Sequence, residues 1–576
     1  MPASDPESIK RPNIVIVLTD DLCYGDLACH GNPHVRTPEL DRLHGESARL
    51  THYCSGPLCT PARASLFTGR YPQRTRAIDT YCGRSMLDPG EVTLAEMLGD
   101  ANYRTGLFGK WHLGDSYPVR PCDMGFDESL VHLGGGLRQP ANIGYDGYFD
   151  PDLMHNGDLE RRQGYCTDIF AEAAMKWIGG GSEDPFSCVV SANAPHSPFE
   201  IGEEWWDRYR DENLPEKWAR VYGMVENIDW NVGRLRTHLA ERGLAENTVF
   251  VFVSDHGPCG SAAVDGKNRF NCGLRARKGS VYQGGLKVPC FWHWPAGIAG
   301  GRDVDRLANP IDFLPTLAEL CGASPPDDRP IDGRSLAPLL RGDAGALESW
   351  PDRSIPIQWH RGDEPIRYRN YAVVGQGEKL CRPGDSADDE YYDLNADPGE
   401  TDDLAPERAE RVADLRRVYD DWFDDVGSTR PDNYAPPRIV VGTARENPVV
   451  LNRNDWRIKD EEGQWKQAEH DGYWLVRIAE SGSYQVTVYL PPVDRSAEVR
   501  LRVGARVWTR ELEPGAEQAV FADLKLPEDD CRVEAQSLTD GSSFGAAMIR
   551  MASQQHPQTV DAEVALKNFF GAARQD

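Results

Sequence analysis

Two apolar segments, far apart in the chain, each run directly into acidic residues. Residues 13–19, NIVIVLT, precede Asp20 and Asp21, and residues 248–254, TVFVFVS, precede Asp255 and His256. Unbroken apolar runs rich in β-branched residues are typical of strands buried on both faces, as in parallel sheets. Because ligands collect at the carboxyl ends of strands in open α/β sheets, we expect both acidic ends to meet at one edge.

Three carboxylates and an imidazole at one edge require a cation between them, because the carboxylates otherwise repel one another. The sequence between the two segments contains Cys59 and Arg63, followed by Thr68, Gly69 and Arg70. This combination predicts a metal-dependent hydrolase with an unusual cysteine.

Length and charge exclude several other classes of protein. A chain of 576 residues is too long for one core, so two or three domains are expected. A net charge of −28 argues against binding to nucleic acid, and no apolar stretch is long enough to span a bilayer. The first ten residues lack an apolar signal core, which predicts a cytoplasmic protein, or a periplasmic or secreted one if a leader has been removed. The 14 cysteines contain no C-x-x-C pair, which favours free thiols over disulfides.

Up to about residue 325, apolar strands alternate with amphipathic segments. A helix over 93–98 precedes a strand over 103–108, another strand covers 186–191, and apolar residues recur at helical spacing between 221 and 239. Alternation of this kind predicts an α/β fold, with a mostly parallel sheet sandwiched by helices.

The pattern changes beyond residue 325. Residues 355–394 predict a small antiparallel sheet, and apolar positions between 412 and 423 predict one amphipathic helix. A proline-rich linker and then short alternating strands follow, which is typical of a β-sandwich. We therefore predict an α/β catalytic domain over 1–325, a small antiparallel C-terminal subdomain over 326–430, and an appended all-β sandwich over 431–576.

Cys59 is expected at the N-terminus of a helix. Thr60 can cap this helix, Pro61 suits its first turn, and Gly69 ends it. Free amide groups and the helix dipole favour an anion at such a position. From these residues alone, Cys59 is either a buried structural thiol or a low-pKa thiolate nucleophile.

The longer string containing Cys59 resembles the signature of the type I sulfatases, members of the alkaline phosphatase superfamily. Residues 59–70, CTPARASLFTGR, fit the family pattern of Cys or Ser, any residue, Pro, any residue, Arg, and then Thr-Gly-Arg. Further blocks of the family occur in the right order, at residues 12–21, 109–114, 195–199, 254–257, 279–285 and 392–398. The resemblance extends to about residue 425, and the remainder resembles the β-sandwich appendices of some bacterial sulfatases.

This resemblance implies that a formylglycine-generating enzyme oxidises Cys59 to formylglycine, whose hydrated aldehyde is the nucleophile. One oxygen would attack sulfur, and deprotonation of the second would expel sulfate. Arg63 would hold the formylglycine oxygen. The metal ligands implied are Asp20, Asp21, Asp255 and His256 together with residue 59. A hard cation with mostly oxygen ligands suits Ca²⁺, one per chain, with Mg²⁺ or Mn²⁺ less favoured.

Four further residues receive roles from the resemblance. Lys110 and His112 are two apart, so both can point into the pocket from an extended segment. There Lys110 would bind a sulfate oxygen, and His112 would be the base in the release step. His196 would protonate the leaving alcohol with Lys278. Without the resemblance, Lys110 and His112 would be assigned to a surface loop and Lys278 to a solvated basic face.

His256 departs from the common pattern, because many relatives have Asn at this position. Some relatives with His prefer phosphonate or phosphodiester substrates. The sequence thus predicts a hydrolase of sulfate esters on a sulfated saccharide or small aryl compound. The alternatives are a formylglycine-dependent phosphonate or phosphodiester hydrolase, or a catalytically silent glycan-binding protein.

Overall fold

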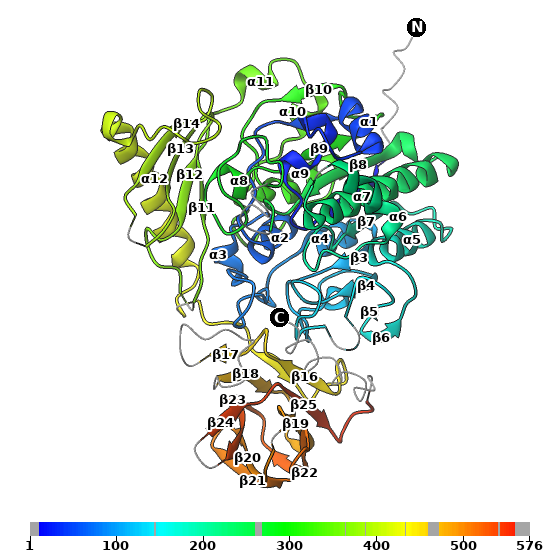
Figure 1. Ribbon diagram of the computed structural model, residues 1–576, viewed down its shortest axis with the longest axis vertical. Coiled ribbons are helices and arrows are strands. Elements are labelled where there is room, and N and C mark those ends of the chain that lie inside the picture. Colours follow the sequence, from blue (N-terminus) through cyan, green and yellow to red (C-terminus); the bar gives the residue numbers. More distant parts are fainter. Residues whose placement is uncertain are drawn as a thin grey trace.

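The computed structural model describes residues 11–558, apart from 143, 145, 213, 260–267, 363, 386, 433, 459–471, 493 and 540–541. A mostly parallel sheet with helices on both faces forms the larger part of the molecule (Figure 1). A small antiparallel sheet lies beside it, and a β-sandwich forms the lower end in the view of Figure 1. The predicted fold class is confirmed.

The central sheet has ten strands among the described residues. Their order across the sheet is β10 (Arg302–Val304), β2 (Ala48–Leu50), β9 (Cys290–His293), β8 (Thr248–Ser254), β1 (Asn13–Thr19), β7 (Phe186–Ser191), β3 (Arg104–Lys110), β4 (Glu128–His132), β5 (Asp152–His155) and β6 (Asp158–Arg161). The five strands from β8 to β4 are parallel to one another. Strand β9 is antiparallel to both of its neighbours, and β5 and β6 add an antiparallel edge.

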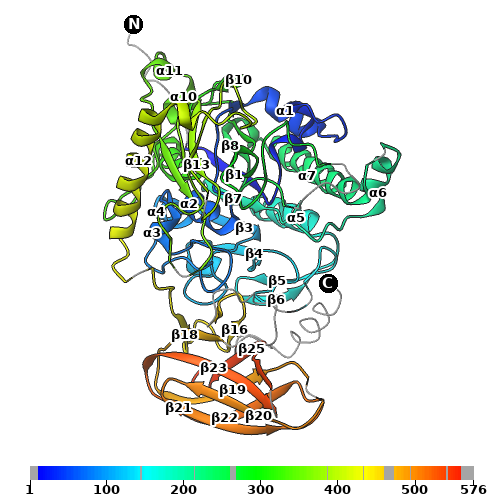
Figure 2. The same ribbon diagram turned by 60° about the vertical axis from the view of Figure 1, so that its left-hand side comes forward.

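The central strands are buried on both faces because helices cover each face. Along β1, Ile14 and Ile16 pack into one apolar core, whereas Val15 and Val17 pack into the other. The first core contains side chains of α2 (Cys59–Thr68), α4 (Leu94–Asp100) and α9 (Phe313–Cys321). The second contains side chains of α1 (Pro38–Glu46), α5 (Cys166–Ile178) and α7 (Glu216–Glu241). Figure 2 shows α2 and α4 on one side of the sheet, and α5 and α7 on the other.

The register of β1 against β8 determines where the site lies. Asn13 is paired with Thr248 and Thr19 with Ser254, so the two strands end at the same level. The backbone N–H of Asp255 donates to the carbonyl of Thr19 at 3.1 Å, which continues the pairing beyond the strands. The prediction that both acidic ends meet at one edge is therefore correct.

The small antiparallel sheet consists of β11 (Ile355–Gln358), β12 (Tyr371–Val374), β13 (Glu378–Arg382) and β14 (Glu390–Asp393). Helix α12 (Ala409–Ser428) covers one face of this sheet through Leu415, Tyr419 and Val426. The other face packs against Leu286 in α8 (Gln283–Leu286) and its surroundings. This packing joins the small sheet to the segment that carries Lys278.

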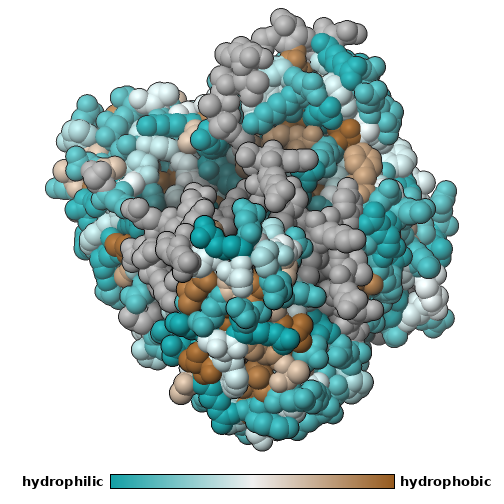
Figure 3. All heavy atoms as spheres, turned by 60° about the horizontal axis from the view of Figure 1, so that its bottom comes forward, coloured by the Kyte–Doolittle hydropathy of each residue, from teal (hydrophilic) through white to brown (hydrophobic). Residues whose placement is uncertain are grey.

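The β-sandwich consists of two sheets. One contains β15 (Ile439–Val441), β17 (Arg457–Ile458), β18 (Gly472–Ile478), β20 (Ala497–Val503), β21 (Arg506–Leu512), β23 (Asp529–Thr539) and β24 (Ser542–Gly545); the other contains β16 (Val449–Asn452), β19 (Gly482–Tyr489), β22 (Gln518–Leu526) and β25 (Met548–Ser553). Val499, Leu501 and Val503 are buried and alternate with exposed residues, as the sequence pattern predicts. The described surface at this end is mostly hydrophilic, with apolar residues in small groups (Figure 3). The exact domain boundaries stay a prediction.

Two sequence predictions concern features outside the site. All 14 cysteines are free thiols. None of the described helices combines the length and the apolar character that crossing a bilayer needs.

Candidate active site

The signature helix α2 places Cys59 at its first position. Every residue of this helix is buried, and Gly69 ends it with a φ of 69°, a left-handed conformation that glycine adopts without strain. The prediction that Thr60 caps the helix is wrong. The helix begins two residues earlier, with Leu58 at the N-cap, and the Thr60 hydroxyl instead donates to the carbonyl of His112 at 3.1 Å. Thr60 thus links the signature helix to the segment that carries His112.

Four of the five predicted metal ligands lie together. One ligand atom each from Asp20, Cys59, Asp255 and His256 lies within 4.8 Å of the others, and all four residues are buried. Asp20 Oδ1 and His256 Nε2 have no hydrogen-bond partner although both are buried. Buried polar atoms are normally paired, so these two atoms mark a position where a cation fits.

The orientation of His256 supports the same assignment. Its Nδ1 lies 2.8 Å from the carbonyl oxygen of Gly257, which requires a proton on Nδ1. The lone pair of the neutral ring is then on Nε2, which lies 3.5 Å from Asp255 Oδ1 and 4.0 Å from Asp20 Oδ1. Metal-bound histidines are commonly held in this way by a backbone carbonyl.

Asp21, the fifth predicted ligand, lies beside this group and extends toward the predicted leaving-group residues. Its Oδ1 is 3.3 Å from His256 Nδ1 and 2.8 Å from Lys278 Nζ. Its Oδ2 is buried without a hydrogen bond, 3.6 Å from His196 Nε2. Asp21 therefore connects the cation position to His196 and Lys278.

Each of the three carboxylates has one oxygen bound by a cationic side chain. Lys110 Nζ lies 2.6 Å from Asp20 Oδ2, and both side chains are fully buried. Arg63 donates from Nε and Nη2 to Asp255 Oδ2 at 3.1 and 2.9 Å. Lys278 binds Asp21 in the same way. The second oxygens of Asp20 and Asp255 face His256.

The same charges shift the pKa values of the groups at the centre. Burial opposes ionisation of Cys59, but Lys110, Lys278 and His112 hold the pKa of its thiol well below the ordinary value. Burial also opposes a charge on His256, but Asp255 and its other neighbours raise the His256 pKa to about 9. The site therefore stabilises an anion at residue 59 and positive charge beside the carboxylates.

Lys110 and His112 both reach the site, but not as neighbours on one extended strand. Lys110 is the last residue of β3, whereas His112 has a φ of 60°, in the left-handed region. His112 lies close enough to Cys59 for the two groups to affect each other's pKa. Its Nε2 lies 3.2 Å from the carbonyl of Thr80, and its buried Nδ1 is unpaired. The chain thus leaves the sheet at Lys110 and turns back so that the imidazole comes to Cys59.

Two glycines of the loop over 134–136 pack directly on the rings of His112 and His196. A Cβ on Gly135 would lie 2.4 Å from His112 Nε2, and one on Gly136 would lie 2.8 Å from His196 Cε1. Only glycine permits this approach without moving a ring. Tyr148 fixes the backbone of His196, because its hydroxyl donates to the carbonyl of His196 at 2.7 Å.

Two further side chains at the site were not predicted from the sequence. Ser191 accepts from Arg63 Nη1 at 2.7 Å and donates to the carbonyl of Lys110 at 2.7 Å. Asp79 is buried close to Cys59, and burial raises its pKa to about 6 although Arg361 bonds it. Ser191 is the last residue of a predicted strand, which was a usable signal. No sequence signal indicated Asp79, because its partner Arg361 comes from the segment between β11 and β12, far along the chain.

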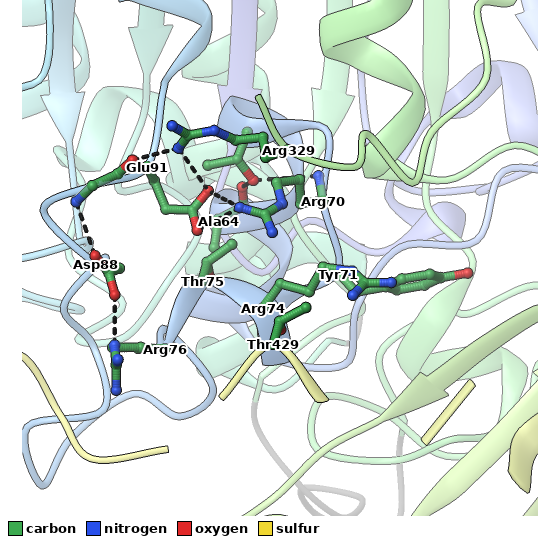
Figure 4. Close-up of polar contacts among 12 residues, drawn as sticks. Ala64, Arg70, Tyr71, Arg74, Thr75, Arg76, Asp88, Glu91, Arg329 and Thr429 are labelled. Carbon is green, nitrogen blue, oxygen red and sulfur yellow. Dashed lines mark hydrogen bonds and ion pairs between the residues drawn. The ribbon is translucent and has the colours of Figure 1, made fainter. Parts of the chain in front are cut away.

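Arg70, which ends the signature string, has a structural position. Its Nη1 lies 2.7 Å from both carboxylate oxygens of Glu91, and Figure 4 shows Arg329 on the other side of the same carboxylate. Arg430, which follows α12, also binds Glu91, at 3.1 Å. Beside this group, Arg76 binds Asp88 at 2.6 Å (Figure 4). The end of the signature helix is thereby tied to the start of the linker toward the sandwich.

The fold and the site are those of an α/β enzyme with a buried cysteine among carboxylates and cationic side chains. Comparison with protein families agrees: the family model described as Sulfatase matches residues 12–323, and the one described as N-sulphoglucosamine sulphohydrolase, C-terminal, matches 276–418. The chain belongs to the sulfatase family and is a sulfuric ester hydrolase.

Individual relatives cover most of the chain. Steryl-sulfatase of Mus musculus is 32% identical over 523 residues, covering 73% of this chain and 82% of its own. Arylsulfatase A of Homo sapiens is 31% identical over 458 residues, covering 69% and 83%. Among solved structures, Ps i-CgsB in complex with k-i-k-neocarrahexaose is similar with a TM-score of 0.64 and 25% identity, covering 74% of this chain and 98% of that one.

Proposed function

We propose that this sulfatase acts through Cys59 oxidised to formylglycine, and through one divalent cation held by Asp20, Asp21, Asp255, His256 and residue 59. The observation that carries this proposal is the pair of buried, unpaired atoms, Asp20 Oδ1 and His256 Nε2, which face one another beside residue 59. The aldehyde hydrate would supply the attacking oxygen, and the cation would act as a Lewis acid toward the sulfate group.

The cationic side chains prepare the pocket for a sulfate ester. Arg63 fixes Asp255 through two donors and Ser191 through a third, so it orients a metal ligand in addition to its proposed contact with residue 59. Lys110 and Lys278 bring positive charge to Cys59. They would bind sulfate oxygens and stabilise the charge that develops on them.

The two histidines would move different protons. Because Nε2 of His112 is directed at the carbonyl of Thr80, Nδ1 is the nitrogen available to accept a proton from residue 59 in the release step. His196 Nδ1 is 2.6 Å from the carbonyl of Ser197, so Nδ1 keeps its proton there. The imidazolium form of the ring would donate its second proton, from Nε2 on the side of Asp21, to the departing alcohol and become neutral.

Ca²⁺ is the proposed cation, since carboxylate oxygens make up most of the donor set. The imidazole of His256 is the one donor that favours Mn²⁺ instead. Elemental analysis of the active enzyme as purified decides between them. An active enzyme without any divalent metal would overturn the cation proposal.

The conversion of Cys59 is tested by mass spectrometry of the peptide that contains it, after expression with a formylglycine-generating enzyme. We expect a mass loss corresponding to replacement of the thiol by an aldehyde, and activity in proportion to the converted fraction. Cys59→Ala should fold and lose about 10⁶-fold in kcat, as for removal of other covalent nucleophiles. Full activity with an unmodified thiol would refute the proposal.

The proposed substrate is a sulfated saccharide or a small aryl sulfate. Support comes from the relatives, whose names specify steryl and aryl sulfatases, and from the similar structure that contains an oligosaccharide. A panel of sulfated sugars and nitrophenyl sulfate tests this proposal. His256 stands where many relatives have Asn, and this departure bears on the ester type. Aryl phosphonate and phosphodiester substrates therefore belong in the same panel, and faster turnover of either would favour the alternative ester class.

A further inference from the structure

A second group of metal-binding side chains lies outside the active site. Cys29 and His30 belong to the short helix η2 (Ala28–His30), which follows the loop that starts at Asp20, and His44 lies in the last turn of α1. One ligand atom each from Cys29, His30 and His44 lies within 4.8 Å of the other two. We propose that these three side chains form a transition-metal site, with Zn²⁺ as the resident ion.

His30 is oriented as a ligand. Its Nδ1 lies 2.7 Å from the carbonyl of Tyr24, so the neutral ring donates from Nδ1 and has its lone pair on Nε2. A backbone carbonyl on the remote nitrogen is the usual support of a metal-bound imidazole. Tyr24 also stacks on the ring, with centroids 4.0 Å apart and planes inclined by 16°, which fixes the direction of Nε2.

Packing against the central sheet holds both imidazoles. Phe291 in β9 meets the ring of His30 edge-on at 5.7 Å between centroids, and that of His44 at 5.2 Å. The two imidazoles lie 5.7 Å apart, nearly perpendicular to each other. The ligands are therefore placed by aromatic contacts before a metal binds, which reduces the cost of ordering them.

The charges around the group permit a divalent ion. The Cys29 thiol hydrogen-bonds Asp41, whose Oδ1 also accepts from the Cys29 backbone at 2.9 Å. Arg49 is the cation beside His44, and it is paired with Asp303 at 2.6 Å. Lys287 lies over Tyr24, the residue that stacks on His30, with its Nζ 4.8 Å from the ring centroid of Tyr24. Asp41 therefore places a carboxylate next to the sulfur, where it would attract a cation.

The donor types select the metal. One thiolate with two imidazoles suits Zn²⁺, whose fourth position would hold water, and it excludes the hard cations that suit the active site. On binding, Zn²⁺ replaces the thiol proton, which leaves to solvent, and the sulfur binds as thiolate without any change of oxidation state. The ion would join η2 to α1, and thus fix the loop that starts at the metal ligands Asp20 and Asp21.

Co²⁺ is a suitable probe, because thiolate-to-cobalt charge transfer gives an absorption that carboxylate sites do not give. Added to the enzyme that holds its catalytic cation, Co²⁺ should bind as one extra ion per chain and produce this absorption. Cys29→Ser should remove the absorption, and His44→Ala should weaken binding at least about tenfold, since a ligand contributes no less than its supporting residues do. The variant His238→Ala, which changes a histidine far along α7, should bind as the unaltered enzyme does.

The Cys59→Ser variant separates this site from the active site, and it should retain the absorption in full. The ion should also raise the melting temperature of the unaltered enzyme, but not that of His44→Ala, because only a native state with the site gains from binding. Should Cys29→Ser fail to fold, His44→Ala gives both readouts. Unchanged binding in His44→Ala, or an absorption that Cys59→Ser abolishes, would overturn the proposal without affecting the proposed sulfatase mechanism.

Discussion

Two regions of the molecule bury groups of carboxylates, and they treat them in opposite ways. In the active site, burial favours protonation of Asp255, but His256, Arg63 and Lys110 hold its pKa below the ordinary value. At the contact between the catalytic part and the sandwich, Asp115 and Asp455 hydrogen-bond each other, and burial raises the pKa of both. Cationic neighbours keep the first group ionised, as metal ligands must be, whereas burial favours a proton on the second.

The contact with the sandwich has a third acid, Glu446. Its Oε2 accepts from the backbone of Tyr117 at 2.7 Å, and burial raises its pKa to about 7 although Arg120 is near. Asn452 donates to Asp115 at 2.6 Å in the same region. The two groups of acids therefore predict different responses to substitution and to pH.

The largest expected effect is that of Asp255→Asn. The amide cannot supply the charge that balances Arg63 and His256, so the variant should lose the catalytic cation and about 10³–10⁴-fold in kcat/KM, the several kcal/mol of a metal Lewis acid. Asp455→Asn is the matched control and should retain the metal and the activity. Metal analysis and turnover of nitrophenyl sulfate measure both. Equal losses in the two variants would show that the comparison is wrong.

The next largest effect is expected for His196, which lies beside Asp21 in the active site. His196→Ala should slow sugar sulfates about 10²-fold, near the lower end for general acids, but should slow nitrophenyl sulfate much less, because nitrophenolate leaves without a proton. The ratio of the two rates in each variant is the measurement. Equal losses on both substrates would leave Lys278 as the better candidate for the acid.

The carboxylates of the active site could be predicted from the sequence, whereas those at the contact with the sandwich could not, and the reason is physical. Asp20 and Asp255 follow apolar strands, and parallel pairing brings such strand ends together whatever the details of packing. Asp115 has no such signal, since its partner Asp455 lies 340 positions away, in the turn between β16 and β17 of the sandwich. Contacts between separate layers depend on how complete surfaces fit. Arg361 at Asp79 was missed for the same reason.

Errors within the site have local causes. The sequence places Thr60 at a cap, but the backbone begins the helix at Cys59, and the hydroxyl pairs across to His112. The positive φ of His112 follows from the turn at the end of β3, which residue spacing alone does not reveal. Side-chain identity thus predicted which residues meet, but not how the backbone brings them there.

A third prediction concerns the acid pair at the sandwich. The raised pKa of Asp455 means that its contribution to stability is complete below its ordinary value of 3.8, and is lost as the pH rises through the raised value. Asp455→Asn should therefore gain stability over the unaltered protein as the pH rises, by about 1–2 kcal/mol. Asp255 has the opposite sign: its contribution is complete above 3.8 and is lost as the pH falls through its lowered pKa.

Chemical unfolding at a series of pH values measures this difference, with sandwich tryptophan fluorescence as the probe of the contact. The double variant with Asp115→Asn should gain less than the sum of the single variants, because the two residues share one hydrogen bond. A stability difference that is constant with pH, or that falls as the pH rises, would remove the proposed proton sharing.

The smallest expected effect is that of Glu446→Gln, a half-buried acid whose amide can still accept from Tyr117. Its pKa of about 7 exceeds the ordinary 4.5, so its contribution is complete below pH 4.5 and is lost as the pH rises through 7. The variant should match the unaltered protein at pH 4.5 and exceed its stability at pH 8 by about 1 kcal/mol, after allowance for partial exposure. Sulfatase activity should not change. If the gain at pH 8 equalled that at pH 4.5, the pKa of Glu446 would not be raised by folding, and the contrast with the active site would rest on Asp115 and Asp455 alone.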